Sequence, residues 1–342
     1  MNNYKSEARN RGQNLLIVEG KHEKDKLFWL LFQCFPEINI SIDDIWVYGT
    51  NIYMLYEDIV KEYGPEWVKD DIDLPFVISK KQNMSTLRYK EDFTNIIIVF
   101  DYERHDTNFS ETKILEMQKY FVDVADMGKL YINYPMLESY QHLRALPDND
   151  YAERKIPVSL KPGKKYKSLV AKETVIEKSV EFPHRIDDLL NQHLGISDEH
   201  ARKTLCNAIL SLSNDCSIDD DIHNILEDAV GAETLLTIKN QLKDWLVKLG
   251  YIHNSQTYWE YMRILFCQII KHNIFKAKRI QNNQFQIEDE KYKVCFEELD
   301  LVEILTKQNL LSRDAVSGYI WVLNTSIFFV ADYNFSLITS QD

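Results

Sequence analysis

The first 145 residues alternate between two patterns of apolar positions, one typical of buried strands and one typical of amphipathic helices. Short apolar runs predict strands at 15–20, 44–49, 94–101 and 129–134, and the run at 94–101 is the clearest because it is rich in β-branched residues. Between them, apolar residues recur every three or four positions, as from Leu27 to Phe35, and this spacing predicts helices. Pro36 ends the first helix, because proline lacks the backbone N–H that would continue it.

Local signals place three further elements. The segment 50–64 reads as a second helix with Thr50 as its N-cap, and Ser110 opens another helix that runs to about Asp126. The run at 74–79 predicts a short extra strand. Because the strand at 94–101 is apolar on both faces, it is typical of a parallel sheet covered by helices on both sides. We therefore expect an α/β fold with right-handed strand–helix–strand units.

The pattern changes after residue 150. Residues 151–182 show no clear period and contain Pro157, Pro162 and Gly163, so they read as a linker or extended loop. Helical spacing dominates from about 186 to 278, and the alternation at 285–296 predicts a small hairpin. The apolar, aromatic tail after Gly318 is expected to be buried or paired.

Composition narrows the class of protein. A hydrophobic content of 45% and 12% aromatic residues argue for a folded chain and against disorder. The apolar runs are too short to cross a membrane, and the polar N-terminus does not resemble a signal peptide. Five scattered cysteines without a CxxC pair indicate neither a disulfide framework nor a zinc site. We expect a reduced, cytoplasmic protein.

Charge is unevenly distributed along the chain. The net charge is −13, yet the stretch from Arg154 to Lys172 contains no acidic residue. This basic window is either a solvated loop or the contact surface for a polyanion. In the second case, Lys161, Lys164, Tyr166 and Lys167 form the candidate substrate-binding set, with the lysines on phosphates and the tyrosine stacked on a base.

Carboxylates follow three of the predicted strands. Glu19 ends the first strand, Asp101 ends the third with Glu103 two residues on, and Glu138 follows the fourth. Taken singly, each is as well explained as an exposed turn residue or a helix-start charge, the interpretation that also suits Glu23. Together at one sheet edge they would repel one another unless a cation lay between them. Hard oxygen ligands favour Mg²⁺ or Mn²⁺ over zinc.

The ordered set of motifs resembles the TOPRIM domain of topoisomerases, bacterial primases and OLD-family nucleases. The resemblance is carried by Val-Glu-Gly at 18–20, the D-x-E motif at 101–103 and Leu-Glu at 137–138, and it covers about 13–145. It implies a TOPRIM fold, a Rossmann-like parallel sheet flanked by helices. The predicted organisation is then a catalytic domain at 1–150 with an insertion at about 65–92, a basic linker at 151–182, and a mainly helical accessory domain at 183–342.

The resemblance also implies roles for individual residues. The expected metal ligands are Glu19, Asp101, Glu103 and Glu138, with Mg²⁺ or Mn²⁺ as the cofactor. Glu19 is either a ligand or a general acid/base. Lysines commonly assist such sites, and Lys21 and Lys165 are the candidate catalytic lysines, although Lys21 equally suits a solvated helix start.

Among TOPRIM proteins, the chain is most similar to OLD-like nucleases and to the TOPRIM effector of the PARIS phage-defence system. That similarity implies a toxin that cleaves tRNA, rather than DNA, in abortive infection. It also implies an ATPase sensor subunit as the partner, and since the chain has no Walker A motif of its own, any ATP-driven sensing would come from that subunit. Homodimer formation through the tail stays open. The alternatives are an inactive TOPRIM-like binding subunit of a larger assembly and a housekeeping RNA-processing nuclease.

Overall fold

The computed structural model describes residues 13–192, 194–212, 218–227, 232–249, 256–284 and 286–339. A six-stranded sheet with the path β2-β1-β3-β5-β4 lies at its centre, and β8 pairs with β5 beside that path. The parallel strands are β1 (Gln13–Val18), β2 (Ile45–Val47), β3 (Phe93–Asp101) and β5 (Gly128–Tyr134). The antiparallel strands are β4 (Val122–Asp123) and β8 (Leu323–Asn324). The expected α/β class with a mainly parallel sheet is confirmed.

The strand register aligns the carboxyl ends of the central strands. Val18 in β1 lies opposite Val99 in β3, and Val99 lies opposite Tyr131 in β5. These strands are buried over most of their length, as their apolar sequences predict. The residues that leave β1, β3 and β5 therefore emerge at one edge of the sheet.

Helices α1 (Trp29–Cys34), α2 (Ile52–Tyr63) and α4 (Glu111–Tyr120) lie where the apolar spacing predicts them, with Ser110 capping α4 as expected. Two details differ. Asn51, not Thr50, caps α2 by accepting a hydrogen bond from the Met54 N–H. The predicted strand at 74–79 is instead helix α3 (Leu74–Lys81), which Asp73 caps through the Phe76 N–H. Its short apolar run did not distinguish strand from helix.

The segment predicted as a linker is ordered. It forms β6 (Lys155–Pro157), which pairs with β7 (Tyr319–Trp321), followed by α5 (Lys164–Glu173) and α6 (Glu177–Val180). The proline and glycine residues separate these short elements instead of marking an open loop. Tyr166 and Val170, one helical turn apart, fix α5 by burying their side chains.

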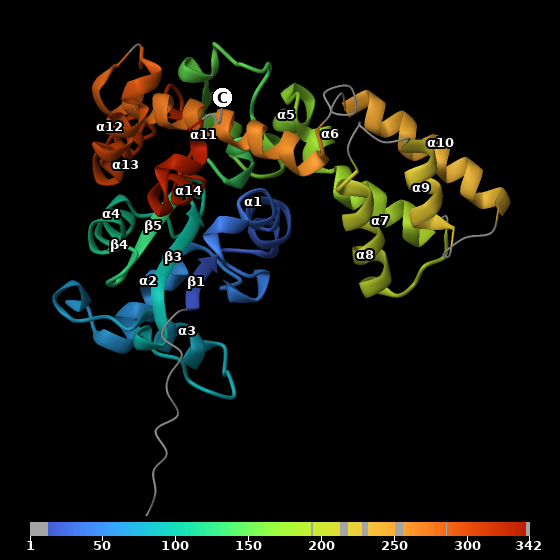
Figure 1. Ribbon diagram of the computed structural model, residues 1–342. Coiled ribbons are helices and arrows are strands. Elements are labelled where there is room, and N and C mark those ends of the chain that lie inside the picture. Colours follow the sequence, from blue (N-terminus) through green and yellow to red (C-terminus); the bar gives the residue numbers. More distant parts are fainter. Residues whose placement is uncertain are drawn as a thin grey trace, which may run out of the picture.

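Four helices form an arm that projects from the sheet-containing body (Figure 1). They are α7 (Phe182–Gln192), α8 (Glu199–Leu210), α9 (Ile218–Leu226) and α10 (Ala232–Leu249). Helix α11 (Tyr258–Asn282) runs from the arm across the body. Within the described residues, no helix combines the length and apolar character needed to cross a membrane.

The C-terminal segment is part of the body. Helix α12 (Tyr292–Glu297) occupies the place of the predicted hairpin and is followed by α13 (Leu301–Leu311) and α14 (Phe328–Tyr333). The tail is buried and paired as expected, because β8 joins the sheet and Phe329 packs against Phe28 and Phe32. Residues 183–342 therefore do not form one separate accessory unit, since their last third completes the sheet-containing body.

Candidate metal centre

The edge where β1 and β3 end brings three of the predicted carboxylates together. Oxygen atoms of Glu19, Asp101 and Glu103 lie within 4.8 Å of one another. Glu19 accepts a hydrogen bond from the Asp101 backbone N–H at 3.2 Å through Oε2, so one acid is held by the strand that carries the other. The parallel pairing of neighbouring strands thus accounts for this approach across 82 positions of sequence.

Asp101 is the most buried member, with only 4% of its surface exposed. Its Oδ1 accepts a hydrogen bond from the Asn133 amide at 3.3 Å, and Asn133 lies directly opposite it in β5. Sequence reasoning did not single out Asn133, because its role depends on the strand register and not on a local pattern. The orientation of Asp101 is thus set by the neighbouring strand.

Glu103 reaches the cluster through a backbone turn. Its φ of 45° lies in the left-handed region, which residues with a side chain seldom adopt. The Glu103 carbonyl accepts a hydrogen bond from the Asp106 N–H at 2.9 Å, which closes the turn. A turn with one strained residue, and not a continuation of the extended strand, thus brings Glu103 to the cluster. Such strain is often retained at functional sites.

The crowded acids raise one another's pKa. Burial raises the pKa of Asp101 well above its usual range, and the charges of Glu19, Glu23, Glu138 and Glu103 add to the rise. Burial and the charge of Glu103 likewise raise the pKa of Glu19. A divalent cation among these oxygens would relieve both the repulsion and the loss of solvation. The donor set contains only oxygen, so it fits Mg²⁺ or Mn²⁺.

Glu23 belongs to the same acidic cluster, contrary to its interpretation as a solvated helix-start charge. Its side chain is buried, and its Oε2 accepts a hydrogen bond from the Gly20 N–H at 2.9 Å. Burial raises the pKa of Glu23 to about 7, and the charge of Glu138 contributes to this rise. The sequence feature that could have indicated this role is the spacing, because Glu23 follows Glu19 by four residues with Gly20 between them.

Gly20 is needed for space and not for an unusual backbone conformation. A Cβ atom at this position would lie 3.2 Å from the Glu23 Oε2, closer than most such contacts. The small size of Gly20 thus permits the close approach of the Glu23 carboxylate.

Glu138 and Lys167 form an ion pair beside the cluster. Lys167 Nζ lies 2.9 Å from Glu138 Oε1, and the other carboxylate oxygen is buried without a hydrogen-bond partner among the described residues. Although burial disfavours the charged lysine, the hydrogen bond and charge of Glu138 raise the pKa of Lys167. Lys167 was predicted as a substrate-binding lysine on the surface, but its ammonium group faces the acidic cluster.

The other basic candidates are spread around α5. Lys161, Lys164 and Lys165 are exposed at or near its start, and Lys21 is exposed beyond β1. Tyr166 is fully buried, with its hydroxyl 3.1 Å from His142 Nδ1. The predicted stacking of Tyr166 on a base is therefore wrong, because neither face of its ring is accessible.

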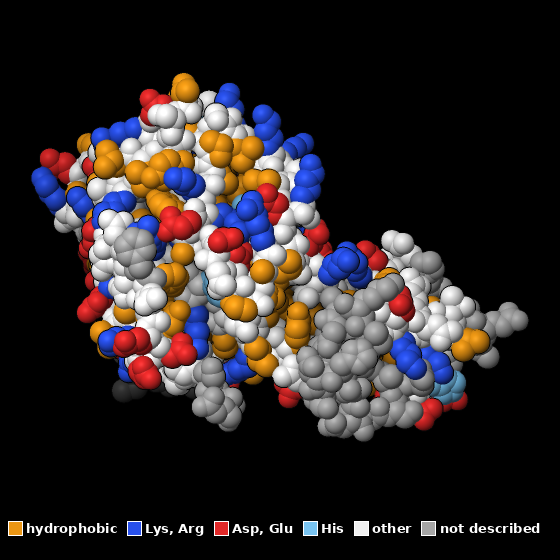
Figure 2. Space-filling view, turned by 90° about the horizontal axis from the view of Figure 1, so that it is seen from above, with side chains coloured by type: hydrophobic (Ala, Val, Ile, Leu, Met, Phe, Trp, Pro, Cys, Tyr) orange, Lys and Arg blue, Asp and Glu red, His pale blue; other side chains and the backbone are white. Residues whose placement is uncertain are grey.

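Basic and acidic groups are mixed on the face that Figure 2 shows, without one continuous basic patch. The acidic cluster is the clearer chemical feature. Its geometry indicates a site for a hard divalent cation at the carboxyl edge of a parallel sheet. Comparisons of this chain with protein-family models, with curated proteins and with solved structures found no match.

Proposed function

We propose that this chain is a metal-dependent nuclease of the TOPRIM type that hydrolyses phosphodiester bonds. The observation that carries the proposal is the approach of Glu19, Asp101 and Glu103 to within 4.8 Å at the tips of two parallel strands. These three acids lie where sites form in parallel sheets, and burial and mutual repulsion raise the pKa values of Glu19 and Asp101.

The roles of the residues follow from their positions. Glu19, Asp101 and Glu103 would hold Mg²⁺ or Mn²⁺, which when bound supplies a Lewis acid for the phosphate and an activated water. Asn133 keeps Asp101 in its orientation through the 3.3 Å hydrogen bond. Lys167 places a positive charge at the rim of the cluster, where it would stabilise the charge that develops on the phosphate oxygens.

Substrate would approach along α5. Lys161, Lys164 and Lys165 are exposed there, close in sequence to Lys167, and they offer contacts for phosphates. Because the whole chain carries a net charge of −13, non-specific attraction to nucleic acid is weak. The resemblance to the PARIS effector favours tRNA as the substrate and an ATPase as the partner that controls cleavage in antiphage defence.

Incubation of the purified protein with tRNA or plasmid DNA in Mg²⁺ or Mn²⁺ tests the proposal. Wild type, alone or with a triggered ATPase partner, should cleave one of these substrates, and Glu19→Gln and Asp101→Asn should not. Glu91→Gln is the matched control, because it removes an exposed acid just before β3, at the opposite end of that strand. Absence of cleavage by wild type under every condition would reject a nuclease function.

The second candidate is a TOPRIM-like subunit that binds partners without cutting. The observation that favours it is the Lys167–Glu138 ion pair, which already supplies one counter-charge to the acidic cluster. Isothermal titration with Mg²⁺ and Mn²⁺ separates the two functions. A nuclease should bind the ion with an affinity that Asp101→Asn weakens at least tenfold, whereas a binding subunit should bind it no better than the variant.

A further inference from the structure

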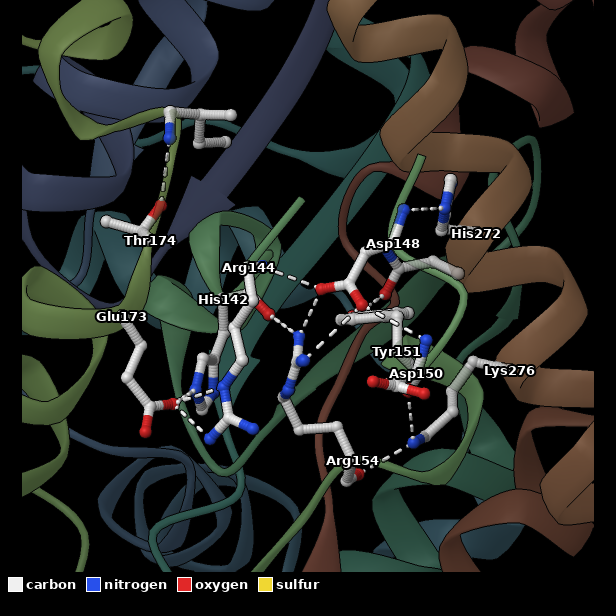
Figure 3. Close-up of polar contacts among 12 residues, drawn as sticks. His142, Arg144, Asp148, Asp150, Tyr151, Arg154, Glu173, Thr174, His272 and Lys276 are labelled. Carbon is white, nitrogen blue, oxygen red and sulfur yellow. Dashed lines mark hydrogen bonds and ion pairs between the residues drawn. The ribbon is translucent and has the colours of Figure 1, made fainter. Parts of the chain in front are cut away.

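A polar network, buried for the most part, joins α5 to the segment that contains His142 and Arg154 (Figure 3). Its central residue, His142, is 1% exposed and uses both ring nitrogens. Nδ1 lies 3.1 Å from the Tyr166 hydroxyl, and Nε2 lies 2.7 Å from Glu173 Oε2. One imidazole thus contacts two residues of the same short helix.

These two contacts hold the two ends of α5. Tyr166 lies in the first turn of the helix, and Glu173 is its last residue. With Val170 they mark the inner face of α5, since residues spaced by four and then three positions lie on one side of a helix. Lys167 follows Tyr166 directly, so the rotation of α5 about its axis decides where the Lys167 ammonium group lies.

The backbone of His142 is itself fixed. Arg154 donates to the His142 carbonyl at 2.5 Å and to Asp148 Oδ2 at 2.6 Å. Asp148 Oδ2 also accepts the Arg144 backbone N–H at 2.6 Å, and Arg144 reaches Glu173 from the outside. Figure 3 shows Arg154 between Asp148 and the His142–Glu173 pair. Both members of the Arg154–Asp148 ion pair are almost fully buried.

Helix α11 anchors the network on its far side. Lys276, which is fully buried, donates from Nζ to the carbonyls of Tyr151 at 2.8 Å and Arg154 at 2.6 Å. The Asp148 backbone N–H donates to His272 Nε2 at 3.0 Å. The frame that holds His142 is therefore tied to the longest helix of the body, which does not contribute to the acidic cluster.

Burying this many charged groups costs solvation energy that an apolar core would not lose. A fully connected polar network has the compensating property that it specifies one arrangement, because each displaced group would leave a buried partner unsatisfied. Here the arrangement so specified is the position of α5. The residue that α5 presents to the acidic cluster is Lys167, 2.9 Å from Glu138.

We propose that His142 is a positioning residue for Lys167. By joining Tyr166 to Glu173 it fixes the rotation of α5, and this rotation places the Lys167 ammonium group against Glu138 at the acidic cluster. The effect on phosphodiester hydrolysis rests on the function proposed above. The effect on the position of Lys167 does not, and it is measurable without metal or nucleic acid.

The test is the reactivity of Lys167 towards an amine-acetylating reagent, followed by peptide mass spectrometry. A paired ammonium reacts slowly, because only the neutral amine is nucleophilic. Tyr166→Phe, which removes one hydroxyl, should increase the rate at Lys167 by a factor of about three to ten, the range expected for loss of one buried hydrogen bond. Glu138→Gln, which removes the ion pair itself, sets the upper limit.

Tyr151→Phe is the matched control. It removes an equally buried hydroxyl, which bonds Asn273 of α11 and not α5, and it should leave the Lys167 rate unchanged. The Lys167 acetylation rate in His142→Gln is a second measurement of the same effect, and thermal unfolding shows whether this variant is folded. If His142→Gln does not fold, Tyr166→Phe still decides. An unchanged Lys167 rate in folded Tyr166→Phe would overturn the proposal.

Activity provides the functional readout. Where wild type cleaves nucleic acid, Tyr166→Phe should lower kcat about three- to tenfold and leave KM within about twofold, because Lys167 acts on the reacting phosphate and not on substrate docking. A merely structural role would lower the melting temperature without this division between kcat and KM. If wild type does not cleave, the proposed function fails while the labelling result stands by itself.

Discussion

At the scale of single residues, the acidic cluster is a balance between burial and repulsion. Asp101 and Glu23 are both nearly inaccessible, burial raises the pKa of each carboxyl, and the charge of Glu23 adds to the rise at Asp101. Such a cluster destabilises the metal-free fold, because buried carboxylates lose solvation and repel one another. The consequences are open to measurement by pH and by single substitutions.

The pH dependence of stability should report Glu23. Burial raises the pKa of Glu23 to about 7 in the folded protein, whereas the pKa of an unperturbed glutamate is 4.5. Between these pH values the folded state therefore binds more protons than the unfolded state. Stability should therefore fall as pH rises from 4.5 to 7, with Glu23 contributing about 3 kcal/mol of that fall in metal-free buffer.

Urea unfolding across this pH range in EDTA measures the effect. Glu23→Gln should flatten the slope, because the amide does not ionise. A slope that is the same in wild type and variant would show that the Glu23 carboxylate is not desolvated as described.

Gly20→Ala should disturb the site without unfolding the protein. The added Cβ would meet Glu23 Oε2 at 3.2 Å and displace the carboxylate from the Gly20 N–H. We expect Mg²⁺ affinity, measured by isothermal titration, to fall about three- to tenfold, with a change of less than about 1 kcal/mol in the free energy of unfolding. In a Glu23→Ala background, Gly20→Ala should have no further effect on affinity.

At the scale of elements, the short strand β8 holds parts of the site that lie far from it in sequence. The Asn324 side chain donates to the Leu137 carbonyl at 3.0 Å, beside Glu138, and accepts from Ser326. The Ser326 N–H donates to Asn133, which orients Asp101. The C-terminal segment thus supports Asp101 of the acidic cluster and the neighbouring Glu138.

Removal of the Asn324 side chain should therefore affect both stability and the site. Asn324→Ala leaves buried backbone groups without partners, and we expect it to lower the free energy of unfolding by about 2–4 kcal/mol. Mg²⁺ affinity of the folded variant should fall as well. The control is Asn334→Ala, which removes an exposed cap of a short C-terminal turn and should cost less than about 1 kcal/mol.

At the scale of the whole molecule, a strongly acidic chain presents a few exposed lysines beside an acidic cluster. Lys161, Lys164 and Lys165 are the accessible charges at or near the start of α5. Replacing all three by alanine should weaken binding to RNA and reduce the slope of log affinity against log salt by roughly 2 to 3. Fluorescence anisotropy in a KCl series measures this slope.

The matched control for charge is the triple alanine variant of Lys69, Lys203 and Lys291, which are exposed in other elements. It should leave the slope within about 0.5 of wild type, because it lowers the net charge equally without removing phosphate contacts. Equal losses in both variants would mean that only the total charge matters, and that α5 is not the contact surface.

The sequence by itself determined the strands and the carboxylates at their tips. The apolar runs that form β1, β3 and β5 are local signals strong enough to place strands, and a parallel sheet gathers Glu19 and Asp101 at one edge. The run at 74–79 is equally short and apolar, so it did not distinguish strand from helix, which is why α3 was predicted as a strand.

Only the tertiary structure decided which neighbours complete the site. Glu23 is buried only in the folded chain. The packing of α5 decides that Tyr166 faces His142 and that Lys167 faces Glu138. Asn324 reaches the site from the far end of the chain. These contacts join residues that are far apart in the sequence or lie outside any repeating pattern. Their energies arise from burial and pairing in the folded chain, so the spacing of hydrophobic residues along the sequence does not predict them.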